Sequence, residues 1–189
     1  MRMWYSNLLK YLTLIKKNNF SIILILILVL SRAIPHPPNF TPIIAVAIMS
    51  SYLFKNQSIS ILVLIISMLI SDIFLGLHEN IFFVYFSLIL ITLISKKVLS
   101  TNKFKSFLFL SFLGPIIFFL ISNFGVWFLG GPGVNNIPYE KNLNGLVECY
   151  LFAIPFFKNT LISTIIFTFG AYFANTIFHR ISKQYFNIN

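Results

Sequence analysis

Charged residues are scarce in this sequence. They make up 10% of its 189 residues, whereas about a quarter of the residues in a typical soluble domain are charged. Hydrophobic residues make up 58% of the chain, and the mean hydropathy is +0.88. This composition excludes an ordinary soluble domain and predicts an integral membrane protein.

Cysteine and recognisable catalytic motifs are lacking as well. The single cysteine, Cys149, excludes an internal disulfide and a cysteine-based metal cluster. The sequence contains no Gly-x-Ser-x-Gly, His-Glu-x-x-His or phosphate-binding Walker motif. We therefore expect neither an enzyme nor a bound cofactor. The net charge of +10 does not indicate a nucleic-acid partner, because the basic residues fall in short stretches between apolar runs.

Six apolar runs predict an all-α protein with six transmembrane helices in a single membrane domain, residues 1–189. A basic lead at 1–19 precedes the runs, which lie at about 20–34, 40–54, 59–77, 81–95, 107–129 and 161–178. Residues 143–154 place apolar side chains at helical spacing and predict an amphipathic outer helix, which Pro155 ends. This helix is either a lid over a site or an ordinary interfacial helix.

The positions of lysine and arginine predict that both termini are cytoplasmic. In this orientation eleven of the fourteen basic residues lie on the inner side of the membrane. Arg32, Lys141 and Lys158 remain on the outer side, together with all four acidic residues.

The stretch from Arg32 to Pro42 holds four prolines between the first two apolar runs. Proline lacks the N–H donor and disfavours helix in the residue before it, so this stretch predicts an irregular outer loop. An ionised side chain within a membrane helix costs about 2.5 to 3.5 kcal/mol and normally faces a partner in the bundle. Arg32 and Asp72 fall at similar depth, and we expect them to form an ion pair. That pair either locks two helices together or binds a polar group of a ligand.

Polar side chains converge on the predicted outer side and form the candidate substrate-binding set, which comprises Arg32, His36, Asn39, Asp72, Asn123 and Trp127. Interfacial aromatic residues commonly occupy positions like that of Trp127 without binding a ligand. A metal or enzymatic site would need His36, His78 and a carboxylate such as Asp72, and two histidines in separate loops are a weak signal for it.

Several strings in the sequence resemble those of an uncharacterised family of small bacterial membrane proteins. The strings are Arg32-Ala-Ile-Pro-His-Pro-Pro-Asn-Phe-Thr-Pro42, Ser71-Asp72-Ile-Phe-Leu-Gly76, Val84-Tyr85-Phe-Ser87, Asn123-Phe-Gly-Val-Trp127 and Ile154-Pro-Phe-Phe-Lys-Asn-Thr160. The order of features is also similar to that of the substrate-binding S components of energy-coupling-factor (ECF) vitamin transporters.

The resemblance implies a bacterial inner-membrane protein that binds a water-soluble vitamin or precursor from the outer side. S components use a small-residue motif on the first helix to dock an energising transmembrane module. Here the first run, Ser21 to Ser31, has no such face. The nearest small-residue patterns are Gly170 with Ala174 and the group Ala45, Ala47, Ser50 and Ser51. The alternative to an uptake protein is a structural or assembly membrane protein without a small-molecule ligand.

Overall fold

The computed structural model describes residues 19–77, 79–99, 103–133 and 137–186. The first helix comprises residues 19–30 and continues into the 3₁₀ turn η1 (Ser31–Ala33). It is followed by α2 (Ile43–Leu53), α3 (Gln57–Leu75), α4 (Ile81–Val98), α5 (Lys103–Leu129) and α6 (Leu143–Phe186). No strand forms within the described ranges, so the expected all-α class is confirmed.

Four of the described helices, α3 to α6, are long and apolar enough to cross a membrane. The first helix with η1 (Asn19–Ala33) and α2 are apolar but shorter. At about 1.5 Å per residue, the eleven residues of α2 extend only about 16 Å, against about 30 Å for a hydrocarbon core. The six predicted runs all form helices, and the crossing length of the first two stays a prediction.

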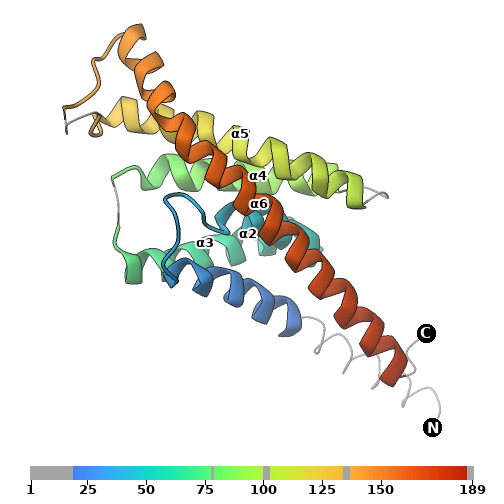
Figure 1. Ribbon diagram of the computed structural model, residues 1–189. Coiled ribbons are helices and arrows are strands. Elements are labelled where there is room, and N and C mark those ends of the chain that lie inside the picture. Colours follow the sequence, from blue (N-terminus) through green and yellow to red (C-terminus); the bar gives the residue numbers. More distant parts are fainter. Residues whose placement is uncertain (1–18, 78, 100–102, 134–136, 187–189) are drawn as a thin grey trace.

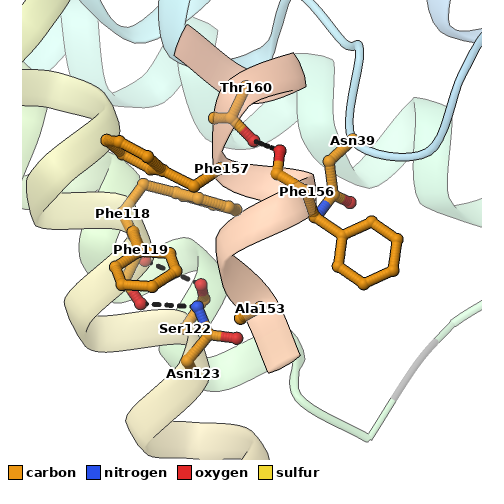
Figure 2. A pocket seen from close by; sticks show the side chains of 9 residues that line it. All are labelled: Asn39, Phe118, Phe119, Ser122, Asn123, Ala153, Phe156, Phe157 and Thr160. Atoms are coloured by element: carbon orange, nitrogen blue, oxygen red, sulfur yellow. Dashed lines mark hydrogen bonds between the residues drawn. The ribbon is translucent and has the colours of Figure 1, made fainter. Parts of the chain in front are cut away.

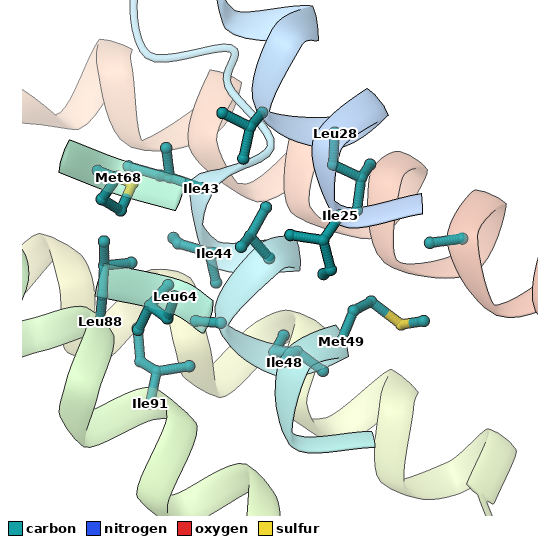
Figure 3. Packing of buried hydrophobic residues seen from close by; sticks show 14 of the residues in the cluster. Ile25, Leu28, Ile43, Ile44, Ile48, Met49, Leu64, Met68, Leu88 and Ile91 are labelled. Atoms are coloured by element: carbon teal, nitrogen blue, oxygen red, sulfur yellow. The ribbon is translucent and has the colours of Figure 1, made fainter. Parts of the chain in front are cut away.

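The short helix α2 lies at the centre of the molecule, in contact with α3, α4, α5 and α6 (Figure 1). Every residue from Ile43 to Ser51 is buried. Figure 3 shows Ile44 and Ile48 of α2 facing Leu64, Leu88 and Ile91 from the surrounding helices. Neighbouring helices cover all sides of α2, which fits its apolar sequence, since a helix that is apolar on every side is a buried one.

Buried hydroxyl groups link α2 to α4. Ser51 Oγ donates to the carbonyl of Thr92 at 2.7 Å, and Thr92 Oγ1 donates to the carbonyl of Ala47 at 3.3 Å. The outer surface is apolar instead: Ile73 and Phe74 on α3 are 71% and 85% exposed. Hydroxyl groups bonded to backbone carbonyls inside and bulky apolar side chains outside fit a chain whose solvent is lipid.

Helix α6 differs from its prediction. Residues 143–154 are helical as expected, but they are continuous with the predicted sixth run in one helix of 44 residues that contains Pro155. Figure 1 shows α6 crossing the bundle obliquely and extending past it. Pro155 is exposed, so the carbonyl that its ring deprives of an amide partner lies on the outer side of the helix, where the loss is tolerated.

The two ends of the described chain meet. The ring of Phe20 at the start of the first helix stacks on that of Phe178 near the end of α6, with centroids 3.9 Å apart. The two ends therefore lie on the same side of the bundle. Their assignment to the cytoplasm stays a prediction.

Candidate binding site

The predicted ion pair forms. Arg32 Nη1 lies 2.9 Å from Asp72 Oδ1, and the Asp72 side chain is only 1% exposed. Arg32 comes from η1, at the end of the first helix, and Asp72 from the last turn of α3. On α3 the residues that face inward, Leu64, Met68 and Asp72, follow one another at helical spacing. The pair therefore joins the C-terminal ends of the first helix and α3.

Tyr85 of α4 completes this cluster. Its hydroxyl donates to Asp72 Oδ2 at 2.8 Å, so each carboxylate oxygen has a strong donor. Arg32 Nη1 also lies 3.6 Å from the sulfur of Met68. The sequence gave no reason to add Tyr85 to the candidate set, because a tyrosine in an apolar run is ordinary. The sequence offered one clue: Arg32 alone leaves the second carboxylate oxygen of Asp72 in need of a hydrogen-bond donor.

Asn39 and Asn123 line the same cavity at a second place, beside α5 and α6. Together with Ser122, Ala153 and Thr160 they line a cavity of about 50 Å³ (Figure 2). Asn39 reaches it because its backbone has a positive φ of 60°, a conformation that asparagine tolerates better than most residues. The cavity has room for a few water molecules and is too small for a vitamin.

A larger groove of about 440 Å³ adjoins this cavity. It shares Asn123, Ala153 and Phe156 with the cavity, and Pro132, Gly133 and Tyr139 line it as well. The first turns of α6 supply Cys149 and Phe152. The segment predicted as lid or interfacial helix therefore forms one wall of the groove.

Tyr139 is a polar residue in the lining of the groove. Burial raises the pKa of its phenol above the ordinary value, and the neighbouring Cys149 and Glu148 raise it further. The hydroxyl therefore stays protonated at neutral pH and can donate a hydrogen bond. Asn123 supplies an amide whose Nδ2 donates to the carbonyl of Phe119 at 2.7 Å, which fixes its orientation.

Trp127 does not line the groove and instead contacts Glu140 and Lys141, the residues just before α6. Its Nε1 donates to the carbonyl of Glu140 at 2.8 Å, and Lys141 Nζ donates to the carbonyls of Trp127 and Phe128. The Lys141 ammonium also lies 5.6 Å from the centroid of the Trp127 ring. These contacts fasten the start of α6 to the end of α5 and so fix the shape of the groove.

The remaining candidates lie apart from the groove. His36 is exposed, and its Nδ1 is 2.7 Å from the carbonyl of Ile34, a local contact within the proline-rich loop. His78 lies outside the described residues. Among the residues that the structure describes, no three His, Cys, Asp or Glu side chains are grouped closely enough to hold a metal ion. The six candidates thus divide into the Arg32–Asp72 ion pair, the two asparagines that line one cavity, and two residues with local contacts.

Apolar helices of crossing length around a core with an ion pair define a helical membrane protein. Comparison with protein families matches residues 13–185 to a family of unknown function (DUF6580), and the chain belongs to that family. No curated protein and no solved structure matches the chain. The expected membership of an uncharacterised family agrees with this result, while the comparisons lend no support to the likeness to S components.

Proposed function

We propose that the protein is a substrate-binding component for uptake of a small water-soluble molecule of vitamin size. Its site is the groove that α5 and α6 line together with Pro132, Gly133 and Tyr139. The observation that carries the proposal is the size and lining of this groove: about 440 Å³, with Asn123 and Tyr139 as polar residues among aromatic and apolar ones. Ligand pockets typically measure about 300 to 1,000 Å³ and place a few polar groups on such walls.

The position of the groove supports the same function. It lies at the C-terminal end of α5 and the N-terminal end of α6, the side predicted to face outward. The adjoining cavity brings Asn39 of the proline-rich loop to the same place. A ligand that enters from outside would therefore meet side chains from two loops and two helices. The proposal involves no catalytic step and no cofactor.

An energising partner would need an exposed docking surface. Ala45, Ala47, Ser50 and Ser51 are buried against the protein's own helices and do not supply one. Gly170 is exposed on α6, and a side chain built there would meet nothing within 4 Å. If the protein docks a transporter module through small residues, we propose that it does so through the face around Gly170.

The test is mass spectrometry of small molecules released from protein purified in mild detergent. Wild type is compared with Asn123→Ala and with the control Asn144→Ala, which removes an exposed amide on α6. Thermal melts against a panel of vitamins and precursors identify the ligand class. We expect a vitamin-sized compound in wild type and in the control, and its loss from folded Asn123→Ala.

One observation favours the alternative, a structural or assembly protein. Both oxygens of Asp72 are already satisfied within the protein, by Arg32 and Tyr85, as in a pair that serves packing. In that case wild type would carry no compound and no vitamin would shift its melting temperature. Arg32→Asp and Asp72→Arg would each misfold, and the double charge swap would recover part of the folded protein.

A further inference from the structure

Arg32 has one edge of its guanidinium group without a partner. The group carries five N–H donors in a planar fork. Nη1 serves Asp72 and Met68, whereas Nε is buried and makes no hydrogen bond. No hydrogen bond joins Nη2 to any other residue in the described part of the chain. Nε and Nη2 share the edge of the guanidinium that lies away from Nη1.

This edge has the geometry for an oxyanion. The N–H bonds of Nε and Nη2 run parallel and match two oxygens of a carboxylate or phosphate group, the bidentate arrangement in which arginine differs from lysine. A buried charged donor without an acceptor is costly, so an acceptor from outside the described chain would stabilise it. Asp72 cannot turn to fill this role, because its two oxygens are held by Nη1 and by Tyr85.

The surroundings of Arg32 add to this argument. Its side chain is 14% exposed, so it lies partly at the protein surface, although Nε itself is buried. The flanking residues Leu30 and Ile34 are 66% and 63% exposed, and Ile73 follows Asp72 as an exposed apolar residue. An arginine framed by apolar surface at a helix end lies at the depth where a membrane presents headgroup phosphates. Glu79, which follows α3 in the sequence, forms no ion pair with Arg32.

We propose that the Nε–Nη2 edge of Arg32 binds one oxyanion, a phosphate or carboxylate group, at the junction of η1 and α3. The oxyanion comes either from an anionic lipid headgroup or from a soluble solute. This site is separate from the groove, whose lining does not include Arg32. Failure of one proposal therefore leaves the other standing.

The experiment is native mass spectrometry of purified protein with added phosphatidylglycerol, compared with diacylglycerol, which has the same tails and no phosphate. Inorganic phosphate and acetate are tested separately by thermal melts at constant ionic strength. Arg32→Lys keeps the positive charge beside Asp72 and removes the fork. Lys158→Gln is the matched control for the loss of an exposed positive charge. We expect binding on the order of tenfold weaker in Arg32→Lys and unchanged in Lys158→Gln.

Asp72→Asn keeps the test decisive if Arg32→Lys fails to fold. It removes the charge that neutralises Arg32, so the oxyanion should bind more tightly than in wild type. Retention of phosphatidylglycerol without a response to phosphate or acetate supports a lipid source, and a response to the free anions supports a soluble one. The proposal is overturned if wild type binds none of these probes, or if folded Arg32→Lys or Asp72→Asn binds them as wild type does.

Discussion

At the scale of single residues, the cost of a charge in lipid was enough to predict one contact. Arg32 and Asp72 had to meet a partner, and each was the nearest candidate for the other at that depth. The same reasoning could not find Tyr85, because burying a neutral hydroxyl group costs much less free energy than burying a charge and so requires no particular partner. Its contact with Asp72 depends on how α4 is rotated against α3, which the sequence does not specify.

Tyr85→Phe tests the value of this contact. The change removes the hydroxyl that donates to Asp72 and leaves one carboxylate oxygen without a donor. Hydrogen bonds to charged groups contribute about 1.5 to 3 kcal/mol, so we expect a loss of that order in the free energy of unfolding. Denaturant titration in detergent measures it.

Tyr172→Phe is the matched control. Tyr172 packs its ring against Tyr52 and Phe107, and its hydroxyl makes no hydrogen bond to a described residue. We expect its substitution to change stability by less than about 0.5 kcal/mol. Equal losses in the two variants would contradict a specific role for the Tyr85 hydroxyl.

At the scale of helices, the sequence located the apolar segments and misjudged one break. The prediction that Pro155 ends a helix assumed that a missing N–H donor must interrupt the chain. Packing decides otherwise, since α6 packs against α5 and α2 and the proline is exposed, so the missing hydrogen bond lies at the helix surface. The burial of α2 also exceeded what its pattern indicated, because an all-apolar helix looks the same in lipid and in a protein core.

Two glycine-to-alanine substitutions test how closely the helices pack. A Cβ atom at Gly125 of α5 would overlap Asn80 Oδ1, from the residue before α4, and the ring of Phe83 in the first turn of α4. Gly125→Ala should therefore separate α4 from α5 and destabilise the protein by about 1 to 3 kcal/mol. Asn80 would be disturbed as well, although its Nδ2 donates to the Ser122 carbonyl at 2.9 Å in the native arrangement.

Gly170→Ala makes the same chemical change on an open helix surface. Nothing lies within 4 Å of the added methyl group. Alanine is favoured over glycine inside a helix by about 0.5 to 1 kcal/mol, so this variant should be slightly more stable than wild type. Melting temperatures measure both effects. If Gly125→Ala and Gly170→Ala shifted the melting temperature in the same direction, the helix packing described above would be wrong.

At the scale of the whole molecule, the class of a helical membrane protein could be predicted from the sequence. The site could be predicted only in part. Hydropathy indicated a membrane protein because the requirement to satisfy the backbone in lipid is general. Asn39 and Asn123 were both expected at the outer end, and they line one cavity. Trp127 was expected beside them, but its contact with the Glu140 carbonyl depends on the path of a loop that no periodicity describes. The groove likewise results from how α6 lies across α5.

The direction of the chain in the membrane is the last prediction. Lys55 and Glu79 lie in exposed turns at opposite ends of α3, whose nineteen residues extend about 28 Å, close to the thickness of a hydrocarbon core. In a chain with Cys149→Ser, we introduce Lys55→Cys or Glu79→Cys and treat intact cells with a membrane-impermeant maleimide. With both termini cytoplasmic, Glu79→Cys should be labelled at once and Lys55→Cys only after the cells are opened. The reverse pattern would invert the topology and turn the groove at α5 and α6 towards the cytoplasm, which would exclude capture of a ligand from outside.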